Sequence, residues 1–332
     1  MAATSRVSYG DEECILLESG SFTAKVLPGV GGNCISFDDS GLDHHYLRTP
    51  GEGELSRFRE APARWGIPFL CPPNRTADGV FRVGERSYRF PINEPENHNQ
   101  LHGPFLRLPW AVEDRGTDGD AAYVLLGQSI EKSHPAFAMI PHRHHITMRY
   151  VLSPRRLAQE VTVENRSDSP LPFMLGFHTV LRVPFAPGSS PEDYRVRVPI
   201  AKRWERGGRM LPTGRLLDLS PIEQELRSDG VPPQGVRWGD YYSGDPGDHR
   251  VTLVDARART RLVYEVGPWF RHWVVWNDDA ASGFFCAEPQ TCTVNAPNLD
   301  IPHEDSGLFF VGPGQSWSDR CTLAPEPVSG VQ

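Results

Sequence analysis

The sequence lacks an apolar stretch long enough to span a bilayer, and its N-terminus lacks the apolar core of a signal peptide. It also lacks a run of basic residues, and its formal net charge at pH 7 is −8. Nucleic acids and anionic membranes attract basic surfaces, so neither is an expected partner. We expect a cytoplasmic protein that associates with neither.

Several motifs that identify common enzyme classes are also missing. There is no GxSxG, no P-loop and no GxGxxG between a strand and a helix. The two-carboxylate pattern of most glycosidases is not evident either. The six cysteines form no CxxC pair, which in a chain of 332 residues favours reduced, mostly buried thiols. Nothing in the sequence indicates a cofactor.

What the sequence does contain is alternation of apolar and polar residues. Residues 157–165 and 194–200 alternate with a period of two, and 251–255 with 261–264 are predicted to form a hairpin. Sustained helical periodicity is nearly absent, and only a short helix is expected at 55–60. Glycine and proline number 31 each, which is typical of many turns between short strands.

No linker, change of composition or internal repeat divides the chain. Hydrophobic residues make up 39% of it, which is enough for a sizeable core and argues against disorder. We therefore predict an all-β fold with one large antiparallel β-sandwich domain over residues 1–323 and a loose tail over 324–332.

Two ionisable groups end apolar, strand-like segments that lie more than a hundred residues apart. In a strand, His178 shares its face with Gly176, which leaves space beside the imidazole. Glu288 ends the other segment, and Pro289 after it is expected to end the strand's pairing. A histidine and a carboxylate brought to one cavity make an acid/base pair. The alternative is a hydrogen-bonded core histidine and a surface charge at a strand end.

Three further segments carry groups suited to binding a sugar. Arg75, which follows Asn74, has five donors in a fixed geometry that fits vicinal hydroxyls. His102 precedes a glycine and is a candidate donor to a hydroxyl or ring oxygen. Asp240 stands among aromatic residues, a combination that binds sugar hydroxyls and covers C–H faces. The alternatives are a surface arginine, a turn histidine and an aromatic core.

A possible metal site lies at His142 and His144, which fall on one predicted strand face. The stretch has no carboxylate or thiolate partner at ligand spacing, so we predict no metal. An incidental or structural ion at this pair of histidines remains the alternative.

Seven segments of the chain occur in an order typical of one known family. They are Gly29-Val30-Gly31-Gly32-Asn33 with Ile35; Gly66 to Arg75 with Asp78, Gly79 and Tyr88; Leu101-His102-Gly103 with Leu108-Pro109-Trp110; Gly176-Phe177-His178; Gly239-Asp240; Glu288-Pro289-Gln290-Thr291 with Asn295-Ala296; and Gly312 to Ser316. Together these segments resemble the aldose 1-epimerase (galactose mutarotase-like) family over most of the chain.

The resemblance implies a β-supersandwich of mostly antiparallel strands with a sugar cleft on its concave face. It implies that Glu288 is a base and His178 an acid. As substrate ligands it implies Asn74, Arg75, His102 and Asp240. Because the acid must be charged while the base is ionised, we expect the proximity of Glu288 to hold the pKa of His178 up.

The expected function is that of an isomerase of carbohydrate metabolism, a mutarotase that interconverts the α and β anomers of a free aldose by acid/base ring opening. Its only expected partner is the monosaccharide, and the chain is expected to be a monomer or a homodimer. One alternative is a sugar-binding or sensing protein of the same fold without turnover. Another is an epimerase for an anionic sugar such as a hexose 6-phosphate; a lyase or hydrolase is a more distant one.

The chain departs from the family pattern at two places. Residues 179–182 follow the histidine where the family commonly has an aromatic pair, and the Pro-Phe before Pro-Asn-Arg is Cys71-Pro72 here. These changes leave the acid/base pair intact but bear on the choice of sugar. Arg182 beside the cleft would favour an anionic sugar, whereas an outward-facing strand arginine would have no such effect.

Overall fold

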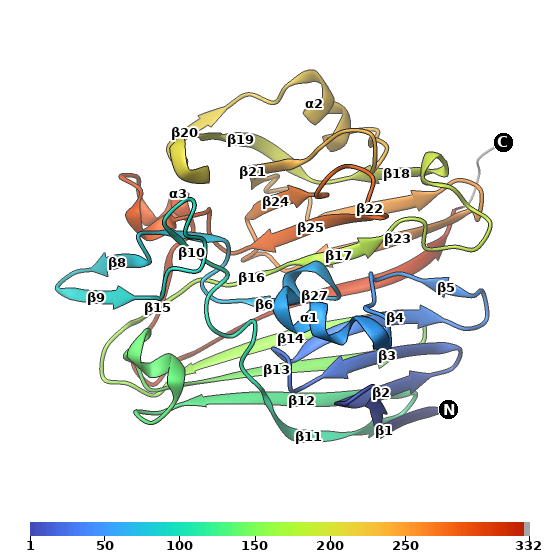
Figure 1. Ribbon diagram of the computed structural model, residues 1–332, viewed down its shortest axis with the longest axis horizontal. Coiled ribbons are helices and arrows are strands. Elements are labelled where there is room, and N and C mark those ends of the chain that lie inside the picture. The colour runs from blue at the N-terminus through green and yellow to red at the C-terminus, as the bar shows by residue number, and fades with distance from the viewer. Residues whose placement is uncertain (329–332) are drawn as a thin grey trace.

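The computed structural model describes residues 1–328 and is built almost entirely of strands. One five-stranded sheet and two eight-stranded sheets make up most of it (Figure 1). The strands within each of these sheets pair antiparallel. The predicted all-β antiparallel sandwich is therefore confirmed.

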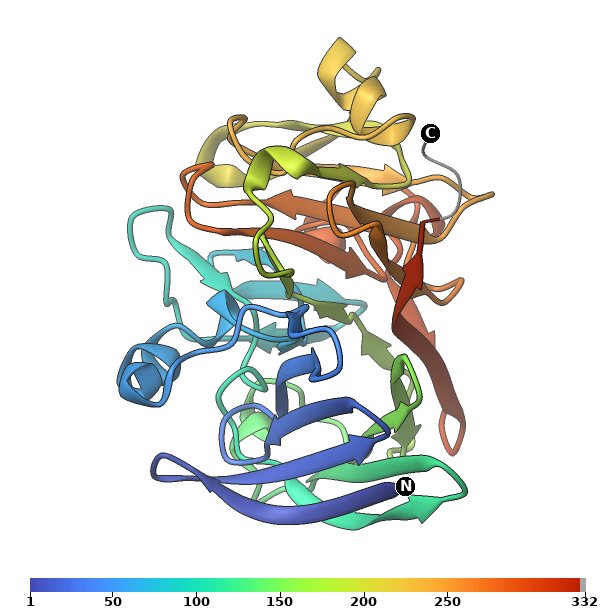
Figure 2. The same ribbon diagram turned by 90° about the vertical axis from the view of Figure 1, so that its right-hand side faces the viewer.

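The five-stranded sheet and the first eight-stranded sheet pack on one another, with β2 and β3 against β12 and β13 (Figure 2). The five-stranded sheet has the order β1 (Ala2–Tyr9), β2 (Glu12–Ser19), β3 (Phe22–Leu27), β4 (Asn33–Asp39) and β5 (His44–His45). The eight-stranded sheet has the order β11 (Ala111–Asp118), β12 (Ala121–Ile130), β13 (His144–Ser153), β14 (Arg156–Asn165), β27 (Ser316–Pro327), β23 (Thr260–Val266), β22 (Arg250–Asp255) and β18 (Tyr194–Arg197).

The second eight-stranded sheet carries the candidate site. Its order is β20 (Pro212–Leu217), β19 (Ile200–Arg206), β21 (Gly239–Gly244), β24 (His272–Trp276), β25 (Phe284–Gln290), β16 (Gly176–Phe177) and β6 (Phe69–Leu70), with β17 (Thr179–Arg182) also paired to β25. β25 therefore lies inside the sheet, with neighbours on both sides.

The remaining elements are short. Three two-stranded sheets pair β7 (Arg75–Ala77) with β10 (Asn99–Leu101), β8 (Val80–Val83) with β9 (Arg86–Arg89), and β15 (Leu171–Phe173) with β26 (Phe309–Val311). The α-helices are α1 (Leu55–Glu60), α2 (Pro221–Arg227) and α3 (His303–Ser306), and the 3-10 helices are η1 (Glu52–Glu54), η2 (Pro62–Arg64), η3 (Pro135–Ala138), η4 (Pro191–Asp193), η5 (Gly208–Met210) and η6 (Ala296–Asn298).

One large hydrophobic cluster joins all three large sheets. It includes Phe37 of β4, Val124 of β12 and Leu253 of β22, all with no solvent exposure. Phe177 of β16 belongs to the same cluster and packs on Phe69. The residue before His178 is thus fixed in the core, so the imidazole is held on the opposite face of the sheet.

The alternating patterns located most of the predicted elements. The run at 157–165 is β14, the hairpin is β22 and β23, and the short helix is α1. The prediction of one strand over 194–200 is wrong, because this run divides into β18 and β19, which lie in different sheets. The apolar run before His178 also divides, since β15 ends at Phe173 and pairs with β26.

The predicted loose tail begins too early at residue 324. Residues 324–327 belong to β27, where Ala324 pairs with Val263 and Pro327 pairs with Thr260. Residues 329–332 of the predicted tail lie outside the described residues. The cysteines match the expectation, because all six are buried and none forms a disulfide. Within residues 1–328, no helix combines the length and apolar character needed to cross a membrane.

Candidate active site

His178 and Glu288 meet on one face of the second eight-stranded sheet. Gly176 pairs with Gln290 and Thr179 pairs with Ala287, so the antiparallel register places His178 directly opposite Glu288. The His178 Nε2 and Glu288 Oε1 atoms are 3.2 Å apart, and the two residues are only 5% and 1% exposed. The two segments deliver their ionisable groups to one place, as the sequence predicted.

The row of side chains continues across the sheet. Glu288 pairs with Val274 of β24, and Val274 pairs with Tyr241 of β21. Pro289 does not end the pairing as expected, because it pairs with Trp273 and the strand runs on to Gln290. Glu288 is therefore held by neighbouring strands on both sides.

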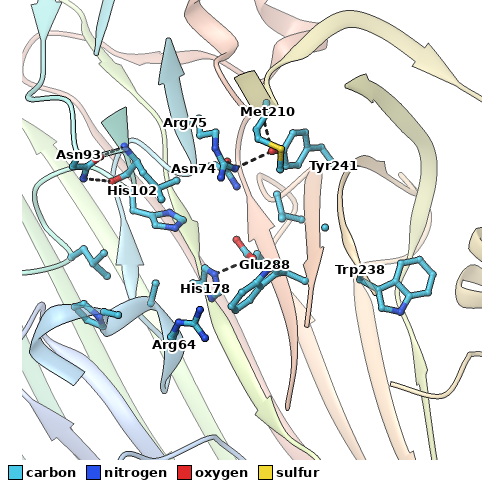
Figure 3. A pocket seen from close by; sticks show the side chains of 18 of the residues that line it. Arg64, Asn74, Arg75, Asn93, His102, His178, Met210, Trp238, Tyr241 and Glu288 are labelled. Atoms are coloured by element: carbon cyan, nitrogen blue, oxygen red, sulfur yellow. Dashed lines mark hydrogen bonds and ion pairs between the residues drawn. The ribbon is translucent and has the colours of Figure 1, made fainter. Parts of the chain in front are cut away.

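A cavity of about 710 Å³ opens above this row, and both His178 and Glu288 line it (Figure 3). That volume is within the range of small-molecule sites. The lining includes all the predicted site residues, namely Asn74, Arg75, His102, His178, Asp240 and Glu288. It also includes Arg237, Trp238 and Tyr241 from the predicted aromatic segment around Asp240, and residues that the sequence did not single out, among them Arg64, Leu106, Arg107, Arg206, Met210 and Trp276.

The guanidinium of Arg75 is already engaged by protein groups. Its Nε and Nη2 atoms donate to Glu94 at 2.9 and 2.6 Å, and Nη1 donates to the Tyr241 hydroxyl at 3.0 Å and to Asn74 Oδ1 at 3.2 Å. The expectation that its whole fork faces vicinal hydroxyls is wrong. Arg75 is instead locked in place, with the Nη1 edge toward the cavity residues Asn74 and Tyr241.

Glu94 anchors this arrangement, and no sequence pattern pointed to this residue. Burial raises the pKa of Glu94, but hydrogen bonds from Arg75 and Asn99 outweigh burial, so the pKa lies below its usual range. The carboxylate therefore stays ionised and neutralises the arginine at neutral pH. Glu94 lies in an irregular segment and comes close to Arg75 only because β7 pairs with β10.

His102 extends the titratable part of the cavity. Its ring meets that of His178 edge to face, with the centroids 5.5 Å apart, and its backbone N–H donates to Asn74 O at 2.8 Å. Burial, then the charges of His178, Arg75 and Arg107, hold its pKa well below the usual value. Within residues 1–328, the His102 Nδ1 atom has no hydrogen-bond partner. A neutral ring with a free nitrogen suits a hydroxyl ligand.

Asp240 is half-buried at the edge of the cavity. Its carboxylate lies 3.6 Å from the Arg206 guanidinium. The aromatic residues around it divide between the two faces of β21. Tyr241 lines the cavity, whereas Tyr242 points to the other face and donates to Glu223 at 2.9 Å. Only part of the predicted aromatic cluster can therefore contact a sugar.

The protonation of the pair differs from the expectation. Burial, with a smaller contribution from the charge of Arg64, lowers the pKa of His178 to about 3. Burial also raises the pKa of Glu288 well above its usual range, against smaller opposing effects of Arg75 and Gln290. The proximity of Glu288 does not hold the histidine's pKa up, because removing both groups from water favours their neutral forms. Burial therefore favours a shared proton on Glu288 rather than on His178.

The two histidines considered for a metal have protein partners instead. His142 Nε2 lies 2.7 Å from the Tyr88 hydroxyl, and His144 Nδ1 lies 2.8 Å from the carbonyl of His142. Burial is the main cause that lowers the pKa of each to about 4. Over the described part of the chain, no group of three or more His, Cys, Asp or Glu is placed to hold a metal.

Arg182 lies on β17 and is exposed, and it is absent from the cavity lining. The reading in which this arginine sets a preference for anionic sugars is wrong. Arginines from other segments line the cavity instead.

A family model described as aldose 1-epimerase matches residues 13–324. The chain belongs to the aldose 1-epimerase family. It is 31% identical to a galactose mutarotase-like protein from Clostridium acetobutylicum, with a TM-score of 0.93 over 98% of each chain.

Two more distant structures share the fold of this family member. A galactose 1-epimerase from Lactobacillus acidophilus is 15% identical, with a TM-score of 0.74 over 98% of this chain and 99% of that one. An aldose epimerase homologue from C. elegans is 14% identical, with a TM-score of 0.71 over 99% of this chain and 100% of that one. At such low identity these two matches support the fold alone.

Proposed function

We propose that the protein is an aldose 1-epimerase that interconverts the α and β anomers of a free aldose, with His178 and Glu288 as its proton-transferring residues. The observation that carries this proposal is the 3.2 Å contact between His178 Nε2 and Glu288 Oε1 at the buried end of a sugar-sized cavity. A buried pair that holds one proton is suited to moving protons to and from a neutral substrate.

Ring opening requires one proton to leave and another to arrive. Glu288, as the carboxylate, takes the proton of the anomeric hydroxyl, while protonated His178 donates to the ring oxygen. The C1–O5 bond breaks and a carbonyl forms at C1. Rotation about the C1–C2 bond then presents the other face of the aldehyde. Ring closure reverses both transfers and gives the other anomer.

The unliganded pair matches one stage of this cycle. After ring opening, Glu288 carries a proton and His178 is neutral, which is the state that burial favours in the free protein. Because the two atoms are 3.2 Å apart, the single proton can pass between them without exchange with solvent. The free enzyme therefore has the same protonation as the open-chain intermediate. Binding of the sugar must shift the proton from Glu288 to His178 before the ring can open.

Binding groups surround the reacting atoms. Arg75, His102 and Asp240 all line the cavity. We assign them, with Asn74, to the sugar hydroxyls. Trp276, whose ring centroid is 5.5 Å from that of His178, offers an apolar face for sugar C–H groups.

Polarimetry of freshly dissolved α-D-glucose and α-D-galactose tests the proposal, with Glu288→Gln as the control protein. Faster relaxation with the wild type, and not with the variant, is the expected result. A wild type that binds a sugar but does not accelerate relaxation of any aldose would favour the alternative, a sugar-binding protein of the same fold.

A further inference from the structure

The lining of the cavity concentrates positive charge in a protein of formal net charge −8. Five arginines and no lysine line it, against three carboxylates. The arginines are Arg64, Arg75, Arg107, Arg206 and Arg237, and the carboxylates are Glu60, Asp240 and Glu288. Burial favours the neutral forms of both Glu288 and His178, so Glu60 and Asp240 supply most of the negative charge of the lining.

Three of the five arginines have a carboxylate partner. Arg75 is paired with Glu94, and Arg64 Nη1 lies 2.6 Å from an oxygen of Asp278. Figure 3 shows these two arginines on opposite sides of the His178 and Glu288 pair. Arg206 lies 3.6 Å from Asp240 and also donates to the carbonyl of Gly239. These three positive charges are compensated within the protein.

The other two, Arg107 and Arg237, are not compensated. Arg107 donates to the backbone carbonyl of Glu60 at 2.9 Å, and among residues 1–328 no carboxylate lies within ion-pair distance of it. Arg237 precedes β21 and has no ion pair among residues 1–328. Both side chains are exposed at the mouth, where a ligand can reach them.

A neutral aldose has no need of two uncompensated cations, because its hydroxyls are satisfied by neutral donors and acceptors. A guanidinium matches the paired oxygens of a carboxylate or a phosphate. The reacting carbon must reach His178 and Glu288 at the buried end of the cavity, so the opposite end of the sugar faces the mouth. Arg107 and Arg237 therefore lie where a substituent remote from C1 would lie.

We infer that the preferred substrate is an aldose with an anionic group, a phosphate ester or a carboxylate, at the end of the carbon chain remote from C1, and that Arg107 and Arg237 bind this group. The inference rests on the proposed epimerase activity and adds the class of substrate to it. Because Arg107 and Arg237 are exposed at the mouth, their contribution to binding the anionic group is modest and depends on ionic strength.

Anomer exchange is measured by NMR for D-glucose, D-glucose 6-phosphate and D-glucuronate at low and at moderate ionic strength. We expect kcat/KM to be about tenfold higher for one or both anionic sugars, as hydrogen bonds to charged groups provide. Comparison of D-glucose 6-phosphate with D-glucuronate shows which of the two anionic groups is preferred. Added salt should reduce the preference.

Arg107→Gln and Arg237→Gln should each lower kcat/KM for the anionic sugar more than for glucose. Arg182→Gln, which removes an exposed arginine outside the cavity, is the matched control and should leave the ratio as it is. Equal kcat/KM for the three sugars, or a preference that survives both variants, would overturn the inference while leaving the epimerase standing. No exchange with any sugar would overturn both.

Discussion

Gly176 lies opposite Gln290, and the missing side chain of the glycine gives Gln290 its place beside Glu288. A Cβ atom at Gly176 would meet Gln290 Cγ and Pro73 Cβ at 2.9 Å each. The Gln290 side chain is fully buried, and neither of its amide atoms has a hydrogen-bond partner in residues 1–328. It nevertheless lies close enough to lower the pKa of Glu288. Gln290 thus supports Glu288 without itself lining the cavity.

Gln290→Met should lower kcat about tenfold with little change in KM, since the carboxylate form of Glu288 loses a stabilising dipole, and one pKa unit is about 1.4 kcal/mol. The basic limb of the kcat–pH profile should move to higher pH. Unfolding free energy should fall little, because the lost amide has no partner. Thr293→Val, which also removes an unpartnered buried polar atom, is the control and should leave the profile in place. An unshifted profile in Gln290→Met would contradict the positioning role.

His178→Asn and Glu288→Gln should each reduce kcat by a hundredfold or more, the typical contribution of one proton-transfer group. Both substitutions keep approximate size and polarity, so the folded state should persist, which circular dichroism checks. Each residue would lose its assigned role if its variant kept the wild-type rate of anomer exchange.

The pH dependence of activity should reflect the burial of the pair. Activity needs one proton on the pair, and a second proton goes onto His178 only near its pKa of about 3. We expect kcat/KM, which reports the free enzyme, to stay level from neutrality down to about pH 4 and to fall below that, rather than to fall near the usual histidine value of about 6.5. Exchange rates measured after a brief pH jump, with the Glu288→Gln background subtracted, would show an acid limb near 6.5 if this is wrong.

Arg75→Ala should mainly raise KM, by about tenfold, since it removes a charged donor from the cavity. Glu94→Gln should also raise KM, and it should lower stability by on the order of 3 kcal/mol, because it leaves the Arg75 charge without its partner. Titration of sugar binding and urea unfolding measure the two effects. Arg82→Ala, an exposed arginine of β8, is the control. Unchanged apparent affinity in Arg75→Ala would remove Arg75 from the set of ligands.

Acid should destabilise the fold through its buried histidines. Burial lowers the pKa of His142 and His144 to about 4 and of His178 and His272 to about 3. The unfolded chain takes up protons as the pH falls below about 6.5, whereas the folded chain does not until pH 3–4. The contribution of the neutral histidines to the unfolding free energy is therefore fully present above pH 6.5 and is lost as the pH falls toward 4. At pH 5 the loss is about 1–2 kcal/mol per histidine.

Urea unfolding at pH 7.5 and pH 5.0 measures this loss. His272→Phe should reduce the difference between the two midpoints, because the imidazole stacks on Trp204 and its Nδ1 has no partner in the described residues. His303→Gln, at an exposed position, should leave the difference as it is. Equal midpoints at the two pH values would show that the buried histidines do not control acid stability.

The sequence predicts the fold and the reacting pair because both depend on local patterns. Alternation over 157–165 is enough to place β14, since one face of that strand is buried and the other is not. His178 and Glu288 are visible because each is a single ionisable group in an apolar strand. Their pKa values are not visible, because the degree of burial depends on how the strands and the cavity walls pack around them.

The remaining site residues come from places without a pattern. Glu94 lies between prolines in an irregular segment, and nothing in the sequence links it to Arg75. Arg64 and Arg107 lie in connections between strands, where an arginine ordinarily faces solvent. Only the folded chain shows that these connections converge on the same cavity.

The floor and the mouth of the cavity are formed by different kinds of structure. Its floor consists of His178, between β16 and β17, and its cross-strand neighbours on β25, β24 and β21, whereas the arginines of its mouth, Arg107 and Arg237, lie in the segment between β10 and β11 and in the segment just before β21. A change of strand residue disturbs pairing on both sides, but a connection can be exchanged with little effect on the sheet. Chimeras that swap only these connections between relatives should therefore transfer the choice of sugar and retain the chemistry.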